Sequence, residues 1–481
     1  MATKFEILEQ LTNPLSSTYK NLDSSYSDPD ILDSKLLKLK NLLNNSALLP
    51  NARTVVSRCP GRLSFSKHAD YINSDLLYTL DDRDTFVAGQ IITDPQHEFF
   101  NKLKLDNLSP EFAPALLPRD SHSSDWTFYP LKILEELKPF IPQNAGVILV
   151  FASDLPPAGG LSSSHALMIS TLITLIELFQ IEILLQALAD RHQASPAQKK
   201  NLKDLLVLLQ RVEHARGFKS GLGDQSAEIF GKKNHLSFIK IHPDLELEYH
   251  KIPSGTLLVT APSMIKADKS LPEFQSANQN IQRYKDINLM ATGFGCEFLG
   301  DLVYKYSQEE IFGILKSIED PQLRGLALYG LAESARLKNL KQDFSIERLG
   351  AHLNLSHQAE IIYKVLDGNW QELSQEEKLF YEFNSSKPLS EHYGIYRAST
   401  KQNDILQHLA TQVPGVYGSS LSGAGLGGNN IILAGPESKT DLINTLDKNF
   451  YQNHGQSALT QLHFSSSSAP AGILTKTSKN T

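Results

Sequence analysis

Apolar and polar positions divide the chain into short apolar runs and longer periodic ones. Residues 147–151 form an uninterrupted apolar run typical of a buried strand, and residues 236–241 and 257–259 are also predicted strands. Between residues 166 and 189, Ser, Thr, Glu and Gln interrupt a long apolar run. A bilayer core would not tolerate those polar groups unpaired, so this run predicts helices of a protein core.

The second half of the chain has a mostly helical pattern. We predict helices at residues 308–318, 323–338, 359–366 and 400–409, then a glycine-rich segment at 415–428 and a strand at 431–434. Two α+β lobes that meet between residues 240 and 260 are the simplest division. The expected parts are an N-terminal extension (1–50), an N-terminal lobe (51–250), a C-terminal lobe (251–465) and a loose tail (466–481).

Composition narrows the function classes. The 481 residues carry 46 Lys and Arg against 53 Asp and Glu, a formal charge of -7, so the chain lacks the basic field that collects nucleic acid. Cys59 and Cys296 are too few for a disulfide framework and lack zinc-site spacing. The N-terminus does not resemble a secretory signal. We therefore expect a cytoplasmic monomer without nucleic-acid or membrane partners.

Three segments carry candidate chemistry. The first, Pro156 to Ala166, places glycines and serines between a predicted strand and a predicted helix, which suits an anion-binding loop. A serine cap that merely begins the helix is the alternative. The second, Cys59 to Tyr71, gathers Arg, Lys, His and Asp after a strand, as a polar-ligand site or a solvated loop would. The third, Gly418 to Gly428, has the glycine density needed for close backbone packing.

Together and in this order, the three segments resemble the signature motifs of the GHMP small-molecule kinases, and most closely those of the galactokinases. The first galactokinase motif is matched by Pro60, Gly61, Arg62, His68, Asp70 and Tyr71. The second is matched from Gly160 to Ser164, and the third from Gly423 to Gly428. Two weaker matches are the Trp126-x-x-Tyr129 segment and Glu213-His214 followed by Gly221 to Gln225.

The resemblance implies a fold and an activity. The expected fold is the α+β, two-lobed GHMP kinase fold, whose N-terminal lobe is similar to domain 2 of ribosomal protein S5 and whose active site lies in the cleft between the lobes. The expected activity is phosphorylation of the anomeric C1 hydroxyl of a monosaccharide, most simply galactose, with ATP and Mg²⁺.

The resemblance also implies a role for each matched residue. Asp224 would be the base, and Arg62 would keep it ionised and offset phosphoryl charge. The expected sugar-binding residues are Lys67, His68, Asp70, Tyr71 and Gly221. The expected ATP-binding residues are Trp126, Gly159, Gly160, Leu161, Ser162, Ser163 and Ser164. The expected Mg²⁺ ligands are Ser164 and Glu213, since this ion takes oxygen ligands and keeps several waters.

Several positions depart from the galactokinase pattern. Lys67 replaces a glutamate, so a hydrogen-bond acceptor becomes a donor. Ser420 and Ser422 replace an arginine and a threonine, and His165 stands where alanine or serine is usual. These changes leave open a kinase for another sugar, such as arabinose, a uronic acid or an N-acetylhexosamine. A sensor without turnover and a non-catalytic interaction protein are the remaining alternatives.

Overall fold

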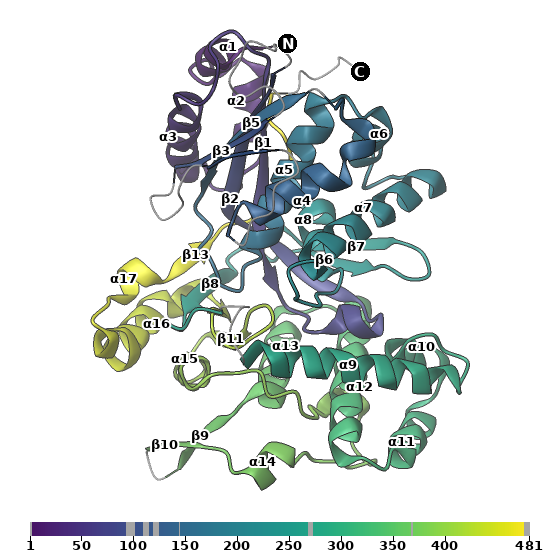
Figure 1. Cartoon of the computed structure of the whole chain (residues 1–481). Helices are drawn as coiled ribbons and strands as arrows, with labels where there is room; N and C mark the ends of the chain where they lie inside the picture. Colours follow the sequence, from purple (N-terminus) through teal and green to yellow (C-terminus); the bar gives the residue numbers. More distant parts are fainter. Residues whose placement is uncertain are drawn as a thin grey trace.

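The structure is a computed structural model that describes residues 2–92, 102–108, 115–118, 125–143, 145–267, 273–366 and 369–475. An eight-stranded and a four-stranded β-sheet lie in two lobes, with a helical region beside the smaller of these two sheets (Figure 1). Within these ranges, no helix combines the length and apolarity needed to cross a bilayer.

The larger sheet forms the N-terminal lobe. Its strand order is β14-β1-β2-β5-β3-β4, with β6 and β7 added beside β2, and its pairs are antiparallel except β3 with β5. The strands are β1 (Thr54–Ser64), β2 (Leu76–Ile92), β3 (Lys102–Asn107), β4 (Ala115–Pro118), β5 (Gly146–Ser153), β6 (His235–Lys240), β7 (Glu246–Lys251) and β14 (Gly472–Ile473).

The central strands β1, β2 and β5 of this sheet are buried on both faces, and alternate residues enter different cores. In β5, Val147, Leu149 and Phe151 belong to the larger core. Ile148 and Val150 face the opposite core. The uninterrupted apolar run at residues 147–151 therefore reflects a central strand covered on two sides.

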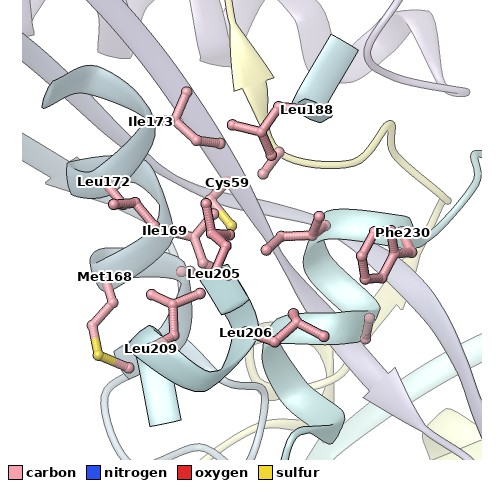
Figure 2. Close-up of a cluster of buried hydrophobic side chains, with 14 of the residues drawn as sticks. Cys59, Met168, Ile169, Leu172, Ile173, Leu188, Leu205, Leu206, Leu209 and Phe230 are labelled. Atoms are coloured by element: carbon pink, nitrogen blue, oxygen red, sulfur yellow. The ribbon is translucent and has the colours of Figure 1, made fainter. Parts of the chain in front are cut away.

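One face of the sheet packs against a group of helices. Figure 2 shows side chains of this core, where Cys59 lies among Ile169, Leu205 and Phe230. The helices are α4 (Phe128–Glu136), α5 (Ser163–Leu178), α6 (Glu182–Ala189), α7 (Pro196–His214) and α8 (Gly223–Phe230). Because α5 is apolar nearly all round, it is fixed in the core, and so is the loop that precedes it.

The first fifty residues cover the other face of the sheet. They form α1 (Lys4–Gln10), α2 (Ser17–Asp23) and α3 (Leu32–Leu43), whose apolar residues share a core with Phe86 and Ile148. The segment that the sequence predicts as an N-terminal extension therefore packs as a layer of the N-terminal lobe.

An ion-pair network joins α3 to β2 and to the residue after β5, where the loop before α5 begins. The Lys35 Nζ lies 3.0 Å from Asp84 Oδ2 and 2.8 Å from Asp154 Oδ2. Asp84 also pairs with Arg58 and accepts a hydrogen bond from the Tyr26 hydroxyl. Burial by itself would raise the pKa of Asp154, but the nearby lysines hold it below its usual value. Asp154 follows β5, so the network fixes the start of the loop.

The C-terminal lobe contains the smaller sheet, with the antiparallel order β11-β12-β8-β13. Its strands are β8 (Leu257–Pro262), β11 (Val416–Leu421), β12 (Asn429–Ala434) and β13 (His463–Ser465). The helices of the lobe are α9 (Glu273–Thr292), α10 (Leu302–Lys305), α11 (Gln308–Ser317), α12 (Pro321–Gln342), α13 (Ile346–Glu360), α14 (Gln375–Leu379), α15 (Lys401–Thr411), α16 (Lys439–Leu446) and α17 (Ala458–Gln461).

Two sequence-based expectations are corrected in this lobe. The helix predicted at residues 359–366 is wrong, because α13 ends at Glu360 and β9 (Tyr363–Leu366) pairs with β10 (Asn369–Glu372). The loose tail is wrong up to residue 475, because β14 pairs with β1 and both Ser468 and Leu474 are buried. Residues 476–481 lie outside the described part.

Candidate active site

The three chemical segments meet around one cavity of about 570 Å³. Its lining includes residues of the loop before α5, the segment after β1, the segment that begins α8 and the glycine-rich loop between β11 and β12. Segments more than 350 residues apart in the chain, such as those of Lys67 and Gly423, therefore contribute to one cavity.

The loop before α5 has a backbone shaped for close approach. Ala158, Gly160 and Ser162 have φ values of 55°, 71° and 69°, so three positions are left-handed within five residues. Strain of this kind is concentrated at functional sites. Ser162 precedes α5 without making a side-chain cap. The alternative in which this serine merely caps the helix is thus not supported, and the first amides of α5 face the cavity.

The second glycine-rich loop packs backbone to backbone on the first. A Cβ on Gly160 would lie 2.6 Å from the carbonyl oxygen of Ser422. The Asn429 amide donates to the Gly159 carbonyl at 3.0 Å, and the Ser422 hydroxyl donates to the Gly160 carbonyl at 2.8 Å. The glycine density of the third segment is therefore explained by contact with the first.

Not every residue expected to bind ATP faces the cavity. Gly160, Ser162, Ser163 and Ser164 line it. Leu161 instead places its side chain in the hydrophobic core, while its carbonyl accepts the Arg62 amide. Gly159 is also absent from the lining, and it contacts Asn429 instead.

Arg62, which is buried, and Asp224, which is half-buried, form an ion pair in the lining of the cavity. The guanidinium donates to Asp224 Oδ1 through Nε at 2.8 Å and through a terminal nitrogen at 2.6 Å, and to the Gly160 carbonyl at 2.7 Å. Arg62 is 3% exposed, so it does not make a surface salt bridge. Burial alone would lower the pKa of Arg62, but the Asp224 charge raises it. The pair links the phosphate loop to the start of α8.

His165 lies between two carboxylates of the cavity. Its Nε2 is 3.1 Å from Glu213 Oε2, and its Nδ1 is 3.6 Å from Asp224 Oδ2. The ring is 1% exposed. The sequence marked this histidine as a departure from the family pattern but assigned it no role. The fold places it as a bridge between α7 and α8.

Ser164 and Glu213 can supply oxygen ligands to a cation. The Ser164 hydroxyl donates to Glu213 Oε1 at 3.4 Å, and both residues line the cavity beside the phosphate loop. A hydroxyl and a carboxylate are hard oxygen donors, and Mg²⁺ needs few of them beside phosphate oxygens and water. The residues present therefore fit this ion.

A second acidic cluster, Asp81, Asp82 and His463, has the spacing of a metal site. Its carboxylates are already bonded within the protein: Asp81 pairs with Arg83, and Asp82 accepts from the Ser466 amide and hydroxyl. The cluster joins β2 to β13 and so connects the two lobes.

Asp70 explains the glycines before α8. Its Oδ2 accepts the Gly223 amide at 2.9 Å, and a Cβ on Gly221 would lie 2.1 Å from the same oxygen. A Cβ on Gly223 would lie 2.3 Å from the hydroxyl of Tyr78. Gly221 and Asp70 both line the cavity, as expected for a sugar site.

His68 and Tyr71 belong to a cluster of aromatic rings at the same end. The His68 ring stacks on Tyr396 with a centroid distance of 3.6 Å, and its Nε2 lies 3.4 Å from Glu360 Oε1. Tyr71 stacks on Tyr284 at 6.3 Å. Tyr396, Tyr284 and Glu360 come from the C-terminal lobe, and no sequence signal had singled them out.

Lys67 is buried beside these residues, and its Nζ donates to the Ser420 hydroxyl. Burial lowers the pKa of Lys67 to about 8. The two departures from the family pattern, at 67 and 420, are therefore neighbours in space.

Trp126 and Arg216 line the opposite end of the cavity. The Trp126 ring packs edge-on against Phe151 at 5.3 Å. The Arg216 guanidinium lies 5.1 Å from the Tyr129 ring centroid and donates to the Asp125 carbonyl at 3.0 Å. Sequence reasoning missed Arg216, although it follows the Glu213-His214 pair by two positions.

Comparisons with known proteins agree with this geometry. Residues 129–232 match the GHMP kinases N terminal domain. Galactokinase of Saccharomyces cerevisiae is 22% identical, with 82% of this chain and 86% of that protein covered. Galactokinase of Chloroflexus aggregans is 24% identical, with 81% and 86% covered. The crystal structure of Lactococcus lactis galactokinase complexed with galactose has a TM-score of 0.68 at 19% identity, and covers 92% of this chain and 99% of its own. This similarity in structure shows a common fold.

Proposed function

The chain belongs to the GHMP kinases, and on this basis we propose that it transfers a phosphoryl group from ATP to the C1 hydroxyl of a monosaccharide. The relatives that it matches are named galactokinases, which makes galactose the reference substrate. The observation that carries the proposal is the Arg62–Asp224 pair, which lies between the phosphate loop and the residues expected to hold the sugar.

Phosphoryl transfer to a hydroxyl requires positioning, charge neutralisation and a proton acceptor. Asp224 would accept the hydroxyl proton through Oδ2, because Oδ1 is held by Arg62. Arg62 would keep Asp224 ionised and offset the negative charge of the transferring group. The amides at the start of α5 and the loop backbone would bind phosphate oxygens.

Ser164 and Glu213 would hold Mg²⁺, which would neutralise phosphate charge when bound. His165 would hold Glu213 and Asp224 in place when no nucleotide is bound. Trp126 and Arg216 would contact the nucleoside end, where the indole offers an apolar surface.

At the other end, His68, Asp70 and Tyr71 would orient the sugar. Asp70 is fixed by the Gly223 amide and can accept a sugar hydroxyl through its other oxygen. We further propose a cytoplasmic monomer whose partners are the sugar and ATP, without nucleic acid or a membrane. The support is the charge of -7 and two buried, unpaired cysteines.

The test is an ADP-release assay with MgATP and a panel of galactose, arabinose, galacturonate and N-acetylgalactosamine. Turnover with at least one sugar, lost in Asp224→Asn, is the expected result. If sugar and nucleotide both bind in calorimetry but no sugar is phosphorylated, the kinase proposal fails and a sensor is favoured. If neither binds, both proposals fail.

A further inference from the structure

Among the residues that the structure describes, one buried ammonium group at the sugar end of the cavity has no anionic partner. Lys67 is 3% exposed and lines the cavity with His68 and Asp70. Its Nζ donates to the hydroxyl of Ser420. Within the described residues, no carboxylate oxygen lies within ion-pair distance of this Nζ. An ammonium has three donors, and a serine hydroxyl satisfies one of them.

Three carboxylates act on Lys67 at longer range, and each of them contacts other groups of the protein. They are Glu333, Glu360 and Asp404. Glu360 accepts the Ala398 amide at 2.9 Å and lies against the ring of His68. Glu333 pairs with Arg336 and His352. Asp404 lies against His357 and accepts two backbone amides. These acids reduce the cost of the buried cation but do not pair with it.

A buried charge without a direct partner is costly, and burial accordingly lowers the pKa of Lys67 to about 8. A neutral hexose would offer Lys67 only hydroxyl oxygens. A carboxylate would offer a charge-assisted hydrogen bond, which is about twice as strong as a neutral one. The desolvated ammonium therefore favours a ligand that carries negative charge at this end.

We propose that Lys67 selects a monosaccharide bearing a carboxylate, a uronic acid, over a neutral hexose. This inference rests on the proposed sugar kinase function and narrows its substrate class. The carboxylate of the sugar pairs with Lys67, while the C1 hydroxyl faces Asp224 at the other side of the sugar subsite. Lys67 takes part in binding and leaves the phosphoryl transfer step to Arg62 and Asp224.

The experiment compares D-galacturonate with D-galactose, which differ at C6. Steady-state ADP release is measured for wild type, Lys67→Met and Lys67→Glu, and calorimetry measures the affinity for each sugar. We expect wild type to favour galacturonate by at least about tenfold in kcat/KM. Lys67→Met should remove this preference through KM, and Lys67→Glu should reverse it. Thermal unfolding shows whether each variant folds.

The outcomes separate this inference from the proposed function. Turnover of galactose at a rate equal to or above that of galacturonate in wild type overturns the inference and leaves the kinase intact. So does an unchanged preference in a folded Lys67→Met. If neither sugar is turned over but galacturonate binds at least about tenfold more tightly than galactose, the acidic-sugar inference stands and the kinase proposal fails. The relative turnover of galacturonate and galactose in wild type tests the inference without any variant. A misfolded Lys67 variant therefore leaves that test unaffected.

Discussion

The two ends of the cavity are built from different parts of the polypeptide. At the phosphate-loop end, backbone amides, left-handed positions and two interlocked glycine-rich loops form the wall. At the sugar end, side chains such as those of Lys67, Asp70 and His68 form it, and Tyr396 and Glu360 of the C-terminal lobe lie behind His68. Arg62 and Asp224 lie where the ends meet.

This difference explains where the chain departs from its family. A backbone wall tolerates few substitutions, because a Cβ on Gly160 would collide with another loop. A side-chain wall can change its charge while the fold persists, as Lys67 and Ser420 show. The backbone wall is therefore suited to a substrate that stays the same across the kinases, as ATP would. The side-chain wall is suited to a substrate that differs among them, as the sugar would.

The largest expected effect is at Asp224, where the two ends of the cavity meet. Asp224→Asn keeps the shape of the side chain but removes the proton acceptor, so we expect kcat to fall about 10³-fold while both substrates still bind. Rapid-quench or coupled ADP-release assays measure it. The control is Glu228→Gln on the same helix. Glu228 is buried and lies outside the cavity lining, and burial and the Asp224 charge raise its pKa well above its usual range. Its amide variant should therefore keep kcat within about threefold. A kcat for Asp224→Asn within tenfold of wild type excludes Asp224 as the base.

The second largest effect is expected when the contact between the two glycine-rich loops is disturbed. Gly160→Ala places a methyl group 2.6 Å from the Ser422 carbonyl, at a φ of 71°. Gly455→Ala is the matched control, because its φ of 67° is similar and nothing lies within 4 Å of the added Cβ. We expect Gly160→Ala to lower the free energy of unfolding by about 2 kcal/mol more than the control and to weaken MgADP binding. Equal losses in urea denaturation would mean that the contact between the loops is not rigid.

The third expected effect is a dependence of galacturonate binding on pH. Lys67 has a pKa of about 8, so its positive charge is present below pH 8 and is lost as the pH rises through that value. The charged and titratable groups that face it are Glu333, His352, Glu360 and Asp404. Despite burial, their partners lower the pKa of both Glu333 and Glu360, and burial lowers that of His352, so these three do not titrate above pH 7.

We therefore expect galacturonate affinity to fall about tenfold between pH 7 and pH 9, measured by calorimetry. Galactose affinity should change far less, and Lys67→Met should abolish the dependence on pH. A fall of the same size in Lys67→Met would assign the titration to another group.

The smallest expected effect concerns His165. His165→Ala releases Glu213 Oε2 from the ring nitrogen 3.1 Å away, so we expect MgADP to bind about threefold more tightly, with ADP alone unchanged. His357→Ala is the control, because that ring is also buried and lies 3.1 Å from a carboxylate, Asp404, but outside the cavity lining. An equal gain for ADP without the cation would show that the ring acts on the phosphates instead.

Much of the site was predictable because local order defines it. The strand before residue 156, the glycines and serines after it and the helix that follows identify the phosphate loop. Glu213 and Asp224 were singled out by the resemblance of their segments to a galactokinase motif. Periodicity failed at residues 359–366, where a helix end and a short hairpin strand share an apolar pattern. It also failed for residues 466–475, whose order comes from pairing with a distant strand.

The sequence by itself determined the family resemblance, the two-lobed α+β class and the residues of the phosphate loop, because these depend on short-range patterns of glycine, serine and apolar residues. Tertiary structure alone decided that His165 bridges two carboxylates, that Asp70 requires Gly221, and that Lys67 meets Ser420 without an acid beside it. Each of these facts joins residues from separate elements. Charge compensation in a buried site depends on distance in space, which one-dimensional spacing does not specify.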